Sequence, residues 1–188
     1  MEHGIEKVRQ RLIRVASALR AAGVSYAVVG GNAVAAWVSR VDETAVRNTR
    51  DVDILLRRQD LPAARVALEA AGFTHRQVAM LGQGGMMDIF LEGSDAKVRD
   101  AVHLLWAHEK VRADHPSPAP DVDQAEDTGE FRLISLPALV SMKLNSFRDK
   151  DRVHLRDLME VGLVDESWMK KLPSELASRL KEILDNPE

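Results

Sequence analysis

Residues 26–37 read YAVVGGNAVAAW and residues 51–56 read DVDILL, and these two segments decide the fold. Tyr26–Val29 has the apolar character of a strand, and it ends directly in Gly30, Gly31 and Asn32. The alanine-rich residues 33–37 favour a helix. Glycine has no Cβ, so another group can approach the backbone N–H groups of Gly30 and Gly31 closely, and a helix N-terminus attracts anions. The segment therefore predicts a strand, a Gly-Gly turn and a helix that begins with an anion site.

The second segment carries two carboxylates on one face of a strand. Alternate residues of a strand point to the same side, so Asp51 and Asp53 project together while Val52 and Ile54 point the other way. Two carboxylates on an otherwise apolar strand repel each other and need a cation or donors. Magnesium prefers oxygen ligands and is commonly held by one or two carboxylates plus substrate phosphates. The pair therefore predicts a metal site.

A metal site beside a phosphate site describes a cleft for a nucleoside triphosphate. The common nucleotide-binding patterns do not explain it, because the chain has neither G-x-G-x-x-G after this strand nor G-x-x-x-x-G-K-[ST]. His103 and His108 are wrongly spaced for one helical face, and the chain has no cysteine and no H-E-x-x-H, so we expect no zinc site among the histidines.

This order of motifs resembles the nucleotidyltransferase superfamily, the DNA polymerase β-like fold. The resemblance lies in Val29-Gly30-Gly31, in Asp51-Val52-Asp53, and in a later carboxylate, for which Asp88 in the segment MMDIF is the best candidate and Glu92 the second choice. The chain is more closely similar to the abortive-infection (AbiEii-like) toxin nucleotidyltransferases. There Gly-Gly-x-Ala precedes Arg-x-Ser/Thr-x-Asp-x-Asp, matched here by residues 30–33, GGNA, and 47–53, RNTRDVD.

The resemblance implies roles for these residues. Two Mg²⁺ ions, with Mn²⁺ as an alternative, would be held by Asp51, Asp53 and Asp88 as the catalytic carboxylates. The NTP phosphates would meet Gly30, Gly31 and Asn32. The remaining nucleotide contacts would come from Arg47, Thr49 and Lys143.

Lys143 has two interpretations from the sequence alone. It lies on the apolar stripe of a predicted helix with Leu136, Leu139, Val140 and Phe147, where a lysine is out of place. Its ammonium group would either contact phosphate or reach solvent along its own apolar stem. We favour the phosphate contact.

The predicted activity is a magnesium-dependent transfer of NMP from an NTP to a hydroxyl acceptor. The resemblance suggests RNA, such as a tRNA end, as the acceptor, with the chain acting as the toxin of a pair with an antitoxin protein. A small-molecule nucleotidyltransferase of the antibiotic-modifying kind shares the same motifs. A catalytically silent nucleotide-binding or interaction module of the same fold is the third alternative.

The pattern along the chain predicts an α/β (α+β) fold, a small mixed sheet flanked by helices. We expect a core over residues 1–112, a loop or linker over 113–130 and a helical C-terminal portion over 131–188. Two strands, 73–81 and 86–91, joined by a turn at 82–85, should place Asp88 beside the Asp51 strand. Residues 101–111 alternate as in a strand, but a helix is an alternative. We expect helices over 5–22, 61–71, 136–147, 152–161 and 176–184.

Composition excludes several other classes. The chain has 188 residues, 45% of them hydrophobic, which is typical of a globular protein. It has no apolar run long enough for a membrane span and no cysteine, and its N-terminal residues are polar, so we expect a cytoplasmic protein with no membrane partner. The net charge of −3 gives no overall attraction to nucleic acid, so an RNA acceptor would need a local basic patch.

Overall fold

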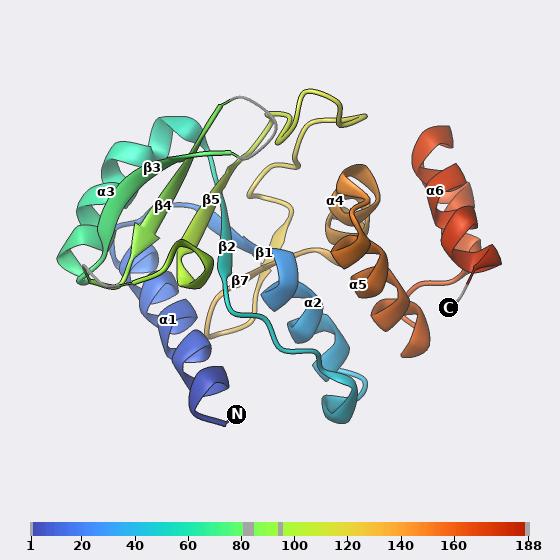
Figure 1. The fold of residues 1–188 in the computed structure, drawn as a ribbon, viewed down its shortest axis with the longest axis horizontal. Coiled ribbons are helices and arrows are strands. Elements are labelled where there is room, and N and C mark those ends of the chain that lie inside the picture. Colours follow the sequence, from blue (N-terminus) through green and yellow to red (C-terminus); the bar gives the residue numbers. More distant parts are fainter. Residues whose placement is uncertain (1, 81–84, 94–95, 187–188) are drawn as a thin grey trace.

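The computed structural model describes residues 2–80, 85–93 and 96–186, and in it one mixed sheet is flanked by helices on both faces (Figure 1). The longer helices are α1 (Glu2–Ala21), α2 (Gly30–Ser39), α3 (Leu61–Ala70), α4 (Leu136–Ser146), α5 (Asp149–Glu160) and α6 (Ser174–Asp185). The strands are β1 (Tyr26–Val29), β2 (Val52–Leu56), β3 (Thr74–Ala79), β4 (Met86–Leu91), β5 (Val102–Trp106), β6 (Ala125–Asp127) and β7 (Arg132–Ile134).

The strand order explains which side chains can meet. The sheet has seven strands in the order β3-β4-β5-β2-β1-β7-β6. β2 pairs antiparallel with β1 but parallel with β5, and β1 pairs parallel with β7. Because parallel and antiparallel pairs occur together, the predicted mixed α/β sheet is confirmed.

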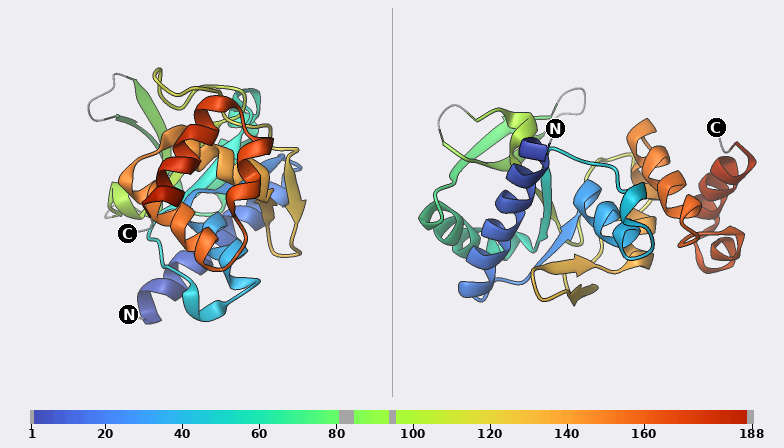
Figure 2. Two further views of the ribbon diagram at one scale, coloured as in Figure 1. Left: turned by 90° about the vertical axis from the view of Figure 1, so that its right-hand side faces the viewer. Right: turned by 90° about the horizontal axis from the view of Figure 1, so that it is seen from below.

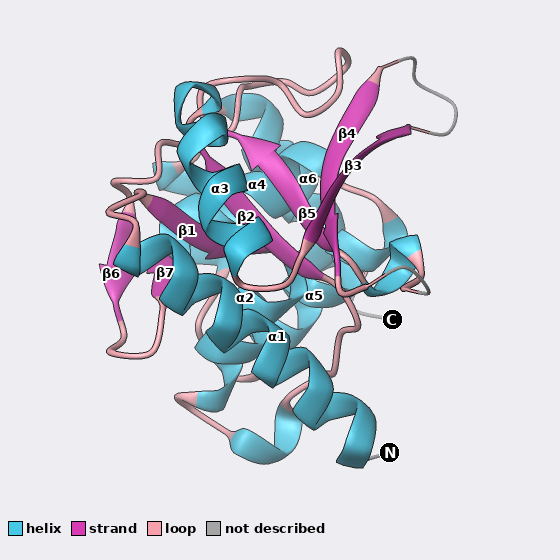
Figure 3. Ribbon diagram, turned by 90° about the vertical axis from the view of Figure 1, so that its left-hand side faces the viewer, coloured by secondary structure: helices cyan, strands magenta, loops and turns pink. Residues whose placement is uncertain are grey.

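Each face of the sheet has its own apolar core. On one face α1 and α3 pack on the sheet, as Figure 3 shows, and Val52 and Ile54 of β2 point into this core. On the other face α2, α4, α5 and α6 pack together, and Leu55 points toward them. Alternate residues of a strand face opposite sides, so Asp53 points to the same side as Leu55. The helices α2 and α4–α6 therefore cover the face that carries the two aspartates.

Several predicted elements differ from the structure in informative ways. Residues 102–106 form a strand, β5, which resolves the choice between strand and helix. β5 lies between β4 and β2, so the strand that carries Asp88 is not beside the Asp51 strand. Part of the expected linker is ordered: residues 125–127 form β6, and Ala119 and Val122 are buried in the core. The predicted turn falls partly on residues 82–84, which lie outside the described residues.

The three C-terminal helices extend the molecule away from β3 and β4. α4 and α5 pack against α2, and α6 packs against α4 and α5 at the far end, as the right-hand view of Figure 2 shows. Helix α5 begins at Asp149, three residues before the predicted start, and the Asp151 carboxylate in its first turn accepts hydrogen bonds from the backbone N–H of Arg148 at 3.2 Å and from its Nε at 2.9 Å. Across the described residues, no helix combines the length and the apolar character that crossing a bilayer requires.

Candidate active site

The two aspartates lie at the start of β2, beside the first turn of α2. Asp53 is the register partner of Val29, the last residue of β1, and α2 starts at the next residue, Gly30. The side chains of Asp51 and Asp53 are 21% and 18% exposed, so water still reaches both carboxylates. The predicted strand, Gly-Gly, helix and strand therefore assemble as one local unit.

Both glycines are needed because side chains of the second segment occupy the space around them. Gly30 has φ +66°, and a Cβ at this position would lie 1.9 Å from Oδ2 of Asp53. A Cβ on Gly31 would lie 2.9 Å from Cβ of Thr49. Val29, at the N-cap of α2, supplies no side-chain acceptor, and the first turn has no acidic residue. The start of α2 is therefore in close contact with the Asp53 carboxylate and keeps uncapped N–H groups.

Three side chains hold the segment that leads into Asp51. The Thr49 hydroxyl donates to the Asp51 carboxylate, and the Asn32 amide donates to the Asp51 carbonyl at 2.7 Å. Arg47 makes two hydrogen bonds of 3.0 Å to Asp157 of α5. Arg47, Thr49 and Asn32 were predicted to contact the nucleotide. In the structure each of them has a partner within the protein, and the contacts of Thr49 and Asn32 position Asp51.

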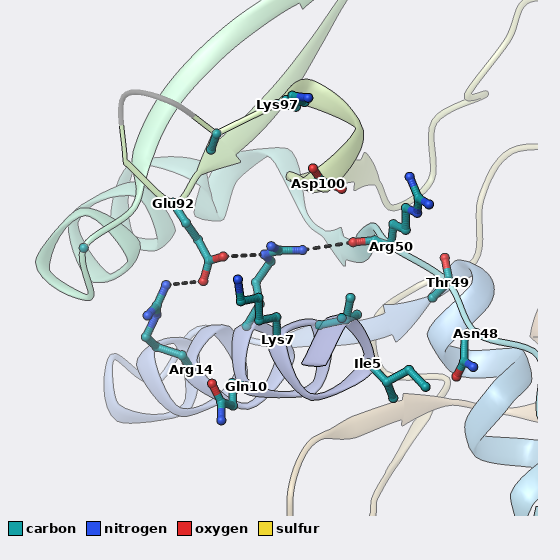
Figure 4. A pocket seen from close by; sticks show the side chains of 15 residues that line it. Ile5, Lys7, Gln10, Arg14, Asn48, Thr49, Arg50, Glu92, Lys97 and Asp100 are labelled. Atoms are coloured by element: carbon teal, nitrogen blue, oxygen red, sulfur yellow. Dashed lines mark hydrogen bonds and ion pairs between the residues drawn. The ribbon is translucent and has the colours of Figure 1, made fainter. Parts of the chain in front are cut away.

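A fourth contact reaches the same segment from the other face of the sheet. Arg11 of α1 is buried, and its guanidinium donates to the Arg50 carbonyl at 2.9 Å and to Glu92 at 2.8 Å. Figure 4 shows these two hydrogen bonds as dashed lines, one ending at Glu92 and the other at the Arg50 carbonyl. Glu92, the second choice for a catalytic carboxylate, is therefore paired with arginines of α1, including Arg14.

Sheet pairing brings a histidine to the two aspartates. His103 of β5 is the register partner of Asp53, and its Nδ1 lies 3.4 Å from Oδ1 of Asp53 and 3.9 Å from Oδ2 of Asp51. Among the described residues these three side chains form the group that could hold a metal ion, with ligand atoms within 4.8 Å of one another. The sequence predicted no metal site among the histidines, but the structure brings His103 to the two carboxylates that were predicted to bind a metal.

The charges of this group shift its pKa values. Burial alone would raise the pKa of Asp51, but the Thr49 hydrogen bond and the charges of Lys150 and His103 outweigh it, so the pKa is lowered. Burial alone would lower the pKa of His103, but its contact with Asp53 and the nearby Val98 carbonyl raise it above the ordinary value. The site therefore favours a cation between the carboxylates.

Asp88, the predicted third carboxylate, is not brought to this group. It shares a strand face with Phe90, which packs in the core under α1 and α3, whereas Asp51 and Asp53 point to the opposite face. Asp88 is buried, and it pairs with His75 Nε2 at 2.8 Å and Gln77 Nε2 at 3.2 Å. These hydrogen bonds join Asp88 of β4 to two side chains of β3.

A pocket of about 290 Å³ opens beside the aspartates. Gly30, Gly31, Asp51, Asp53 and His103 form one wall. The C-terminal part of the chain adds the basic residues Lys143, Arg148 and Lys150 to the lining. The Lys150 ammonium lies 3.6 Å from Oδ2 of Asp51. The pocket therefore combines cations with the carboxylates. Residues 148–151, RDKD, match a segment rich in Arg, Lys and Asp of the family that the chain resembles, but the sequence alone assigned this segment no catalytic role.

Lys143 does not reach solvent along its own stem, and within the protein its ammonium contacts a carboxylate. Its ammonium is buried and donates to Oδ1 of Asp151 at 3.0 Å, while Arg148 binds the other oxygen of the same carboxylate at 2.9 Å. Burial alone would raise the pKa of Asp151, but the two cations hold it well below its usual range. Lys143 still lines the pocket, so an anion there would compete with Asp151 for it.

The apolar end of the pocket contains polar groups without hydrogen-bond partners. His115 is 5% exposed, and neither of its ring nitrogens has a hydrogen-bond partner. Burial lowers its pKa, so the ring is neutral at pH 7, with one donor and one acceptor. The buried Nε of Arg112, which also lines the pocket, has no hydrogen bond but lies 3.7 Å from Oδ1 of Asp114. A buried polar group without a hydrogen bond is costly, so the His115 ring has an unused donor and an unused acceptor beside the pocket.

A second and wider hollow, about 1200 Å³, lies between α1 and the segments around residues 48–50 and 96–100 (Figure 4). Its lining has five basic residues and two acidic ones, in a chain whose net charge is −3. The basic residues are Lys7, Arg11, Arg14, Arg50 and Lys97. We call this hollow the basic groove. It adjoins the active site, because Thr49 lines the groove and binds Asp51.

The architecture is that of the nucleotidyltransferase fold, as comparison with solved structures shows. The chain is similar to an antigenic nucleotidyltransferase-like protein from Paracoccidioides brasiliensis, with a TM-score of 0.57 and 15% identity over 97% of this chain and 89% of that one. It is also similar to the antibiotic-resistance factor ANT(2'')-Ia in solution, with a TM-score of 0.53 and 15% identity over 97% of this chain and 93% of that one. No family model and no curated sequence matches the chain.

Proposed function

We propose that the chain is a metal-dependent nucleotidyltransferase that transfers NMP from an NTP to a hydroxyl group. One observation carries the proposal: Asp51 and Asp53 share a pocket with the uncapped start of α2 and with the basic residues of α4 and α5. Carboxylates select a divalent cation, while N–H groups and basic side chains select phosphate. An NTP with its metal ion supplies both.

The residues present fit a metal ion. Asp51 and Asp53 would hold it, because their carboxylates are close together and the Thr49 hydrogen bond orients one of them. When bound, a divalent ion stabilises charge on the attacking and leaving oxygens of an in-line displacement. We propose Mg²⁺ or a similar ion. Asp88, on the opposite face of the sheet, has no role in this proposal.

The chain's own groups would bind and orient the phosphates. The N–H groups of Gly30 and Gly31 and the ammonium of Lys150 line the pocket near Asp51, and Arg148 lies next to them. In the transfer the acceptor oxygen forms a bond to the α-phosphorus, and the bond from this phosphorus to the β-phosphate oxygen breaks. The hydroxyl proton is released, and pyrophosphate takes the bonding electrons. Positioning and charge are sufficient for this chemistry, so the protein needs no nucleophile.

The ring nitrogens of His115, which have no hydrogen-bond partner, would bind the nucleoside. The same pocket is also lined by Leu105, Val111 and Met142. A nucleobase has apolar faces and a polar edge, so it suits a site that combines apolar walls with a donor and an acceptor. We therefore propose that the base occupies this end of the pocket.

We propose RNA, including a tRNA end, as the acceptor, and the basic groove supports this choice. A strand of phosphates would meet Lys7, Arg50 and Lys97, since Arg11 and Arg14 are paired with Glu92, and it would end close to Asp51. The structural similarity to ANT(2'')-Ia, an antibiotic-resistance factor, supports a small molecule as the second candidate. An antitoxin partner and a cytoplasmic location remain predictions from the sequence.

The experiment that tests the function uses each labelled NTP with Mg²⁺ or Mn²⁺ and either total RNA or a panel of antibiotics that carry hydroxyl groups. We expect the label on RNA in the wild type and no transfer in Asp53→Asn. Label on an antibiotic would support the second candidate. If no NTP gives transfer or raises the melting temperature, the chain is a silent module of the same fold.

Two further variants make this test sharper. Asp53→Asn should keep its fold, because removing one carboxylate relieves repulsion, and circular dichroism checks this. Asp88→Asn tests the sequence prediction that Asp88 is a catalytic carboxylate. Because Asp88 lies on the opposite face of the sheet, we expect this variant to keep its transfer activity. Loss of transfer in a folded Asp88→Asn protein would return Asp88 to the site.

A further inference from the structure

His103 approaches the two carboxylates with one particular ring nitrogen. Its Nε2 lies 3.0 Å from the Val98 carbonyl oxygen. A carbonyl oxygen only accepts hydrogen bonds, so Nε2 carries the hydrogen and donates it. In the neutral ring Nδ1 then has a free lone pair, and Nδ1 is the atom that lies 3.4 Å from Asp53 and 3.9 Å from Asp51. The Val98 carbonyl therefore directs a nitrogen lone pair toward the carboxylates.

This arrangement has the features of a histidine that binds a metal. A ligating histidine typically donates its other N–H to a carbonyl or carboxylate, which fixes the tautomer and the ring orientation. Ligand atoms about 2.0 to 2.2 Å from one ion lie roughly 3 to 4 Å apart, which matches the distances from Nδ1 to the two carboxylates. His103 is also held by the sheet, because β5 pairs with β2 along its whole length. Little movement is needed to bring the three ligand atoms to one ion.

We propose that Asp51, Asp53 and His103 form a mixed oxygen and nitrogen metal site that binds a first-row transition ion such as Mn²⁺ more tightly than Mg²⁺. The reason is ligand chemistry: Mg²⁺ binds oxygen ligands and rarely accepts imidazole, whereas Mn²⁺ and its heavier neighbours bind both. This proposal rests on the metal-dependent function above. It goes beyond that function by assigning His103 and the class of ion.

A competing role for His103 is purely structural. As an imidazolium, His103 would neutralise the two carboxylates and hold β5 against β2 without binding a metal. Such a histidine would give no nitrogen contact to a bound ion and would not change which ion the site prefers. The nitrogen contact and the ion preference therefore distinguish the two roles, while activity alone does not.

The test measures Mn²⁺ binding to the whole chain without NTP. Pulsed electron paramagnetic resonance detects the coupling of a directly bound imidazole nitrogen to Mn²⁺. We expect a ¹⁴N coupling in the wild type that becomes a ¹⁵N coupling when the protein is labelled only at histidine. This measurement needs no variant, so a folding defect cannot obscure it. The control variant, used where His103 is replaced, is His108→Asn. His108 is 65% exposed, and asparagine tolerates its φ of 64°.

The second part compares ion preference by calorimetry. His103→Ala should weaken Mn²⁺ binding by at least about 10- to 100-fold, the effect of losing a group that supports the ligand set. His103→Asp supplies a third carboxylate and should lower the ratio of Mn²⁺ to Mg²⁺ affinity by about tenfold or more. His108→Asn should leave both affinities at the wild-type level.

Different results would refute the role of His103 and the metal site itself. If wild type binds Mn²⁺ and Mg²⁺ with equal affinity and shows no histidine coupling, the role of His103 is refuted while the carboxylate site stands. A ratio unchanged in His103→Asp would refute it too. If Asp53→Asn binds Mn²⁺ as tightly as wild type, the metal site is elsewhere, and both proposals fail.

Discussion

Replacing Lys143 by methionine tests how the C-terminal helices are joined to the active site. The Lys143 and Asp151 side chains are 7% and 1% exposed, so this ion pair is almost fully removed from water. Losing one partner of a buried pair costs about 3–5 kcal/mol, because the other charge is left behind. Asp151 keeps Arg148, whose side chain is 60% exposed. We therefore expect a smaller loss than this range, about 2–3 kcal/mol, or roughly 5–10 °C in melting temperature.

The matched control removes both charges. In the double variant Lys143→Met with Asp151→Leu, no unpaired charge remains, and replacement of a buried pair by apolar residues is often close to neutral. Urea unfolding of the wild type, both single variants and the double variant gives a double-mutant cycle. The double variant should be more stable than either single variant. A Lys143→Met protein within about 1 kcal/mol of wild type, or strictly additive effects, would refute the buried pair.

The pH dependence of stability checks the same pair. The pKa of Asp151 in the folded protein lies below its ordinary value, so the ionised carboxylate stabilises the fold. This contribution is fully present above the unfolded pKa of about 3.9 and is lost as pH falls below it. The stability difference between wild type and Lys143→Met should therefore shrink as the pH is lowered from about 5 to 3. A constant difference over that interval would contradict the assignment.

Two further predictions concern the wall and the end of the pocket. Gly30→Ala and its control Gly23→Ala both place a side chain at positive φ, at a cost of about 1–2 kcal/mol. Only the Cβ at residue 30 meets Asp53. Calorimetry should therefore show a loss of Mn²⁺ affinity in Gly30→Ala and none in Gly23→Ala. His115→Leu removes two unpartnered buried nitrogens, so it should not destabilise the free protein, but it should weaken NTP binding and leave inorganic triphosphate binding unchanged. Equal loss of both ligands would place His115 away from the nucleoside.

The sequence predicted the part of the candidate site whose residues are close together in the chain. Gly30, Asp51 and Asp53 occur within a short strand, helix and strand, and their relation follows from strand periodicity and the need for backbone space. The structure places the three residues together as expected. Such relations depend on neighbours in sequence, where the period of a strand fixes which side chains share a face.

The residue that lies third beside Asp51 and Asp53 could not be predicted in this way. Asp88 and His103 both lie on strands with apolar neighbours, so each was compatible with a place in the sheet. Which of them meets Asp53 depends on the register and on the insertion of β5 between β4 and β2. A shift of one residue reverses the face of every side chain in a strand. Only the assembled sheet reveals that His103 faces Asp53 and that Asp88 faces the other core.

The spacing of the 47–53 motif has an explanation that differs from nucleotide contact. Arg47, Thr49, Asp51 and Asp53 are two residues apart, so an extended chain carries them on one side. The first reaches Asp157 of α5, and the second binds the Asp51 carboxylate. Together they hold two repelling carboxylates in place before any cation arrives. An active site that relies on charge and position gains most from groups fixed in advance, because no energy is then spent on reorganising them during the reaction. The motif would therefore fix the two carboxylates of the proposed metal site in advance.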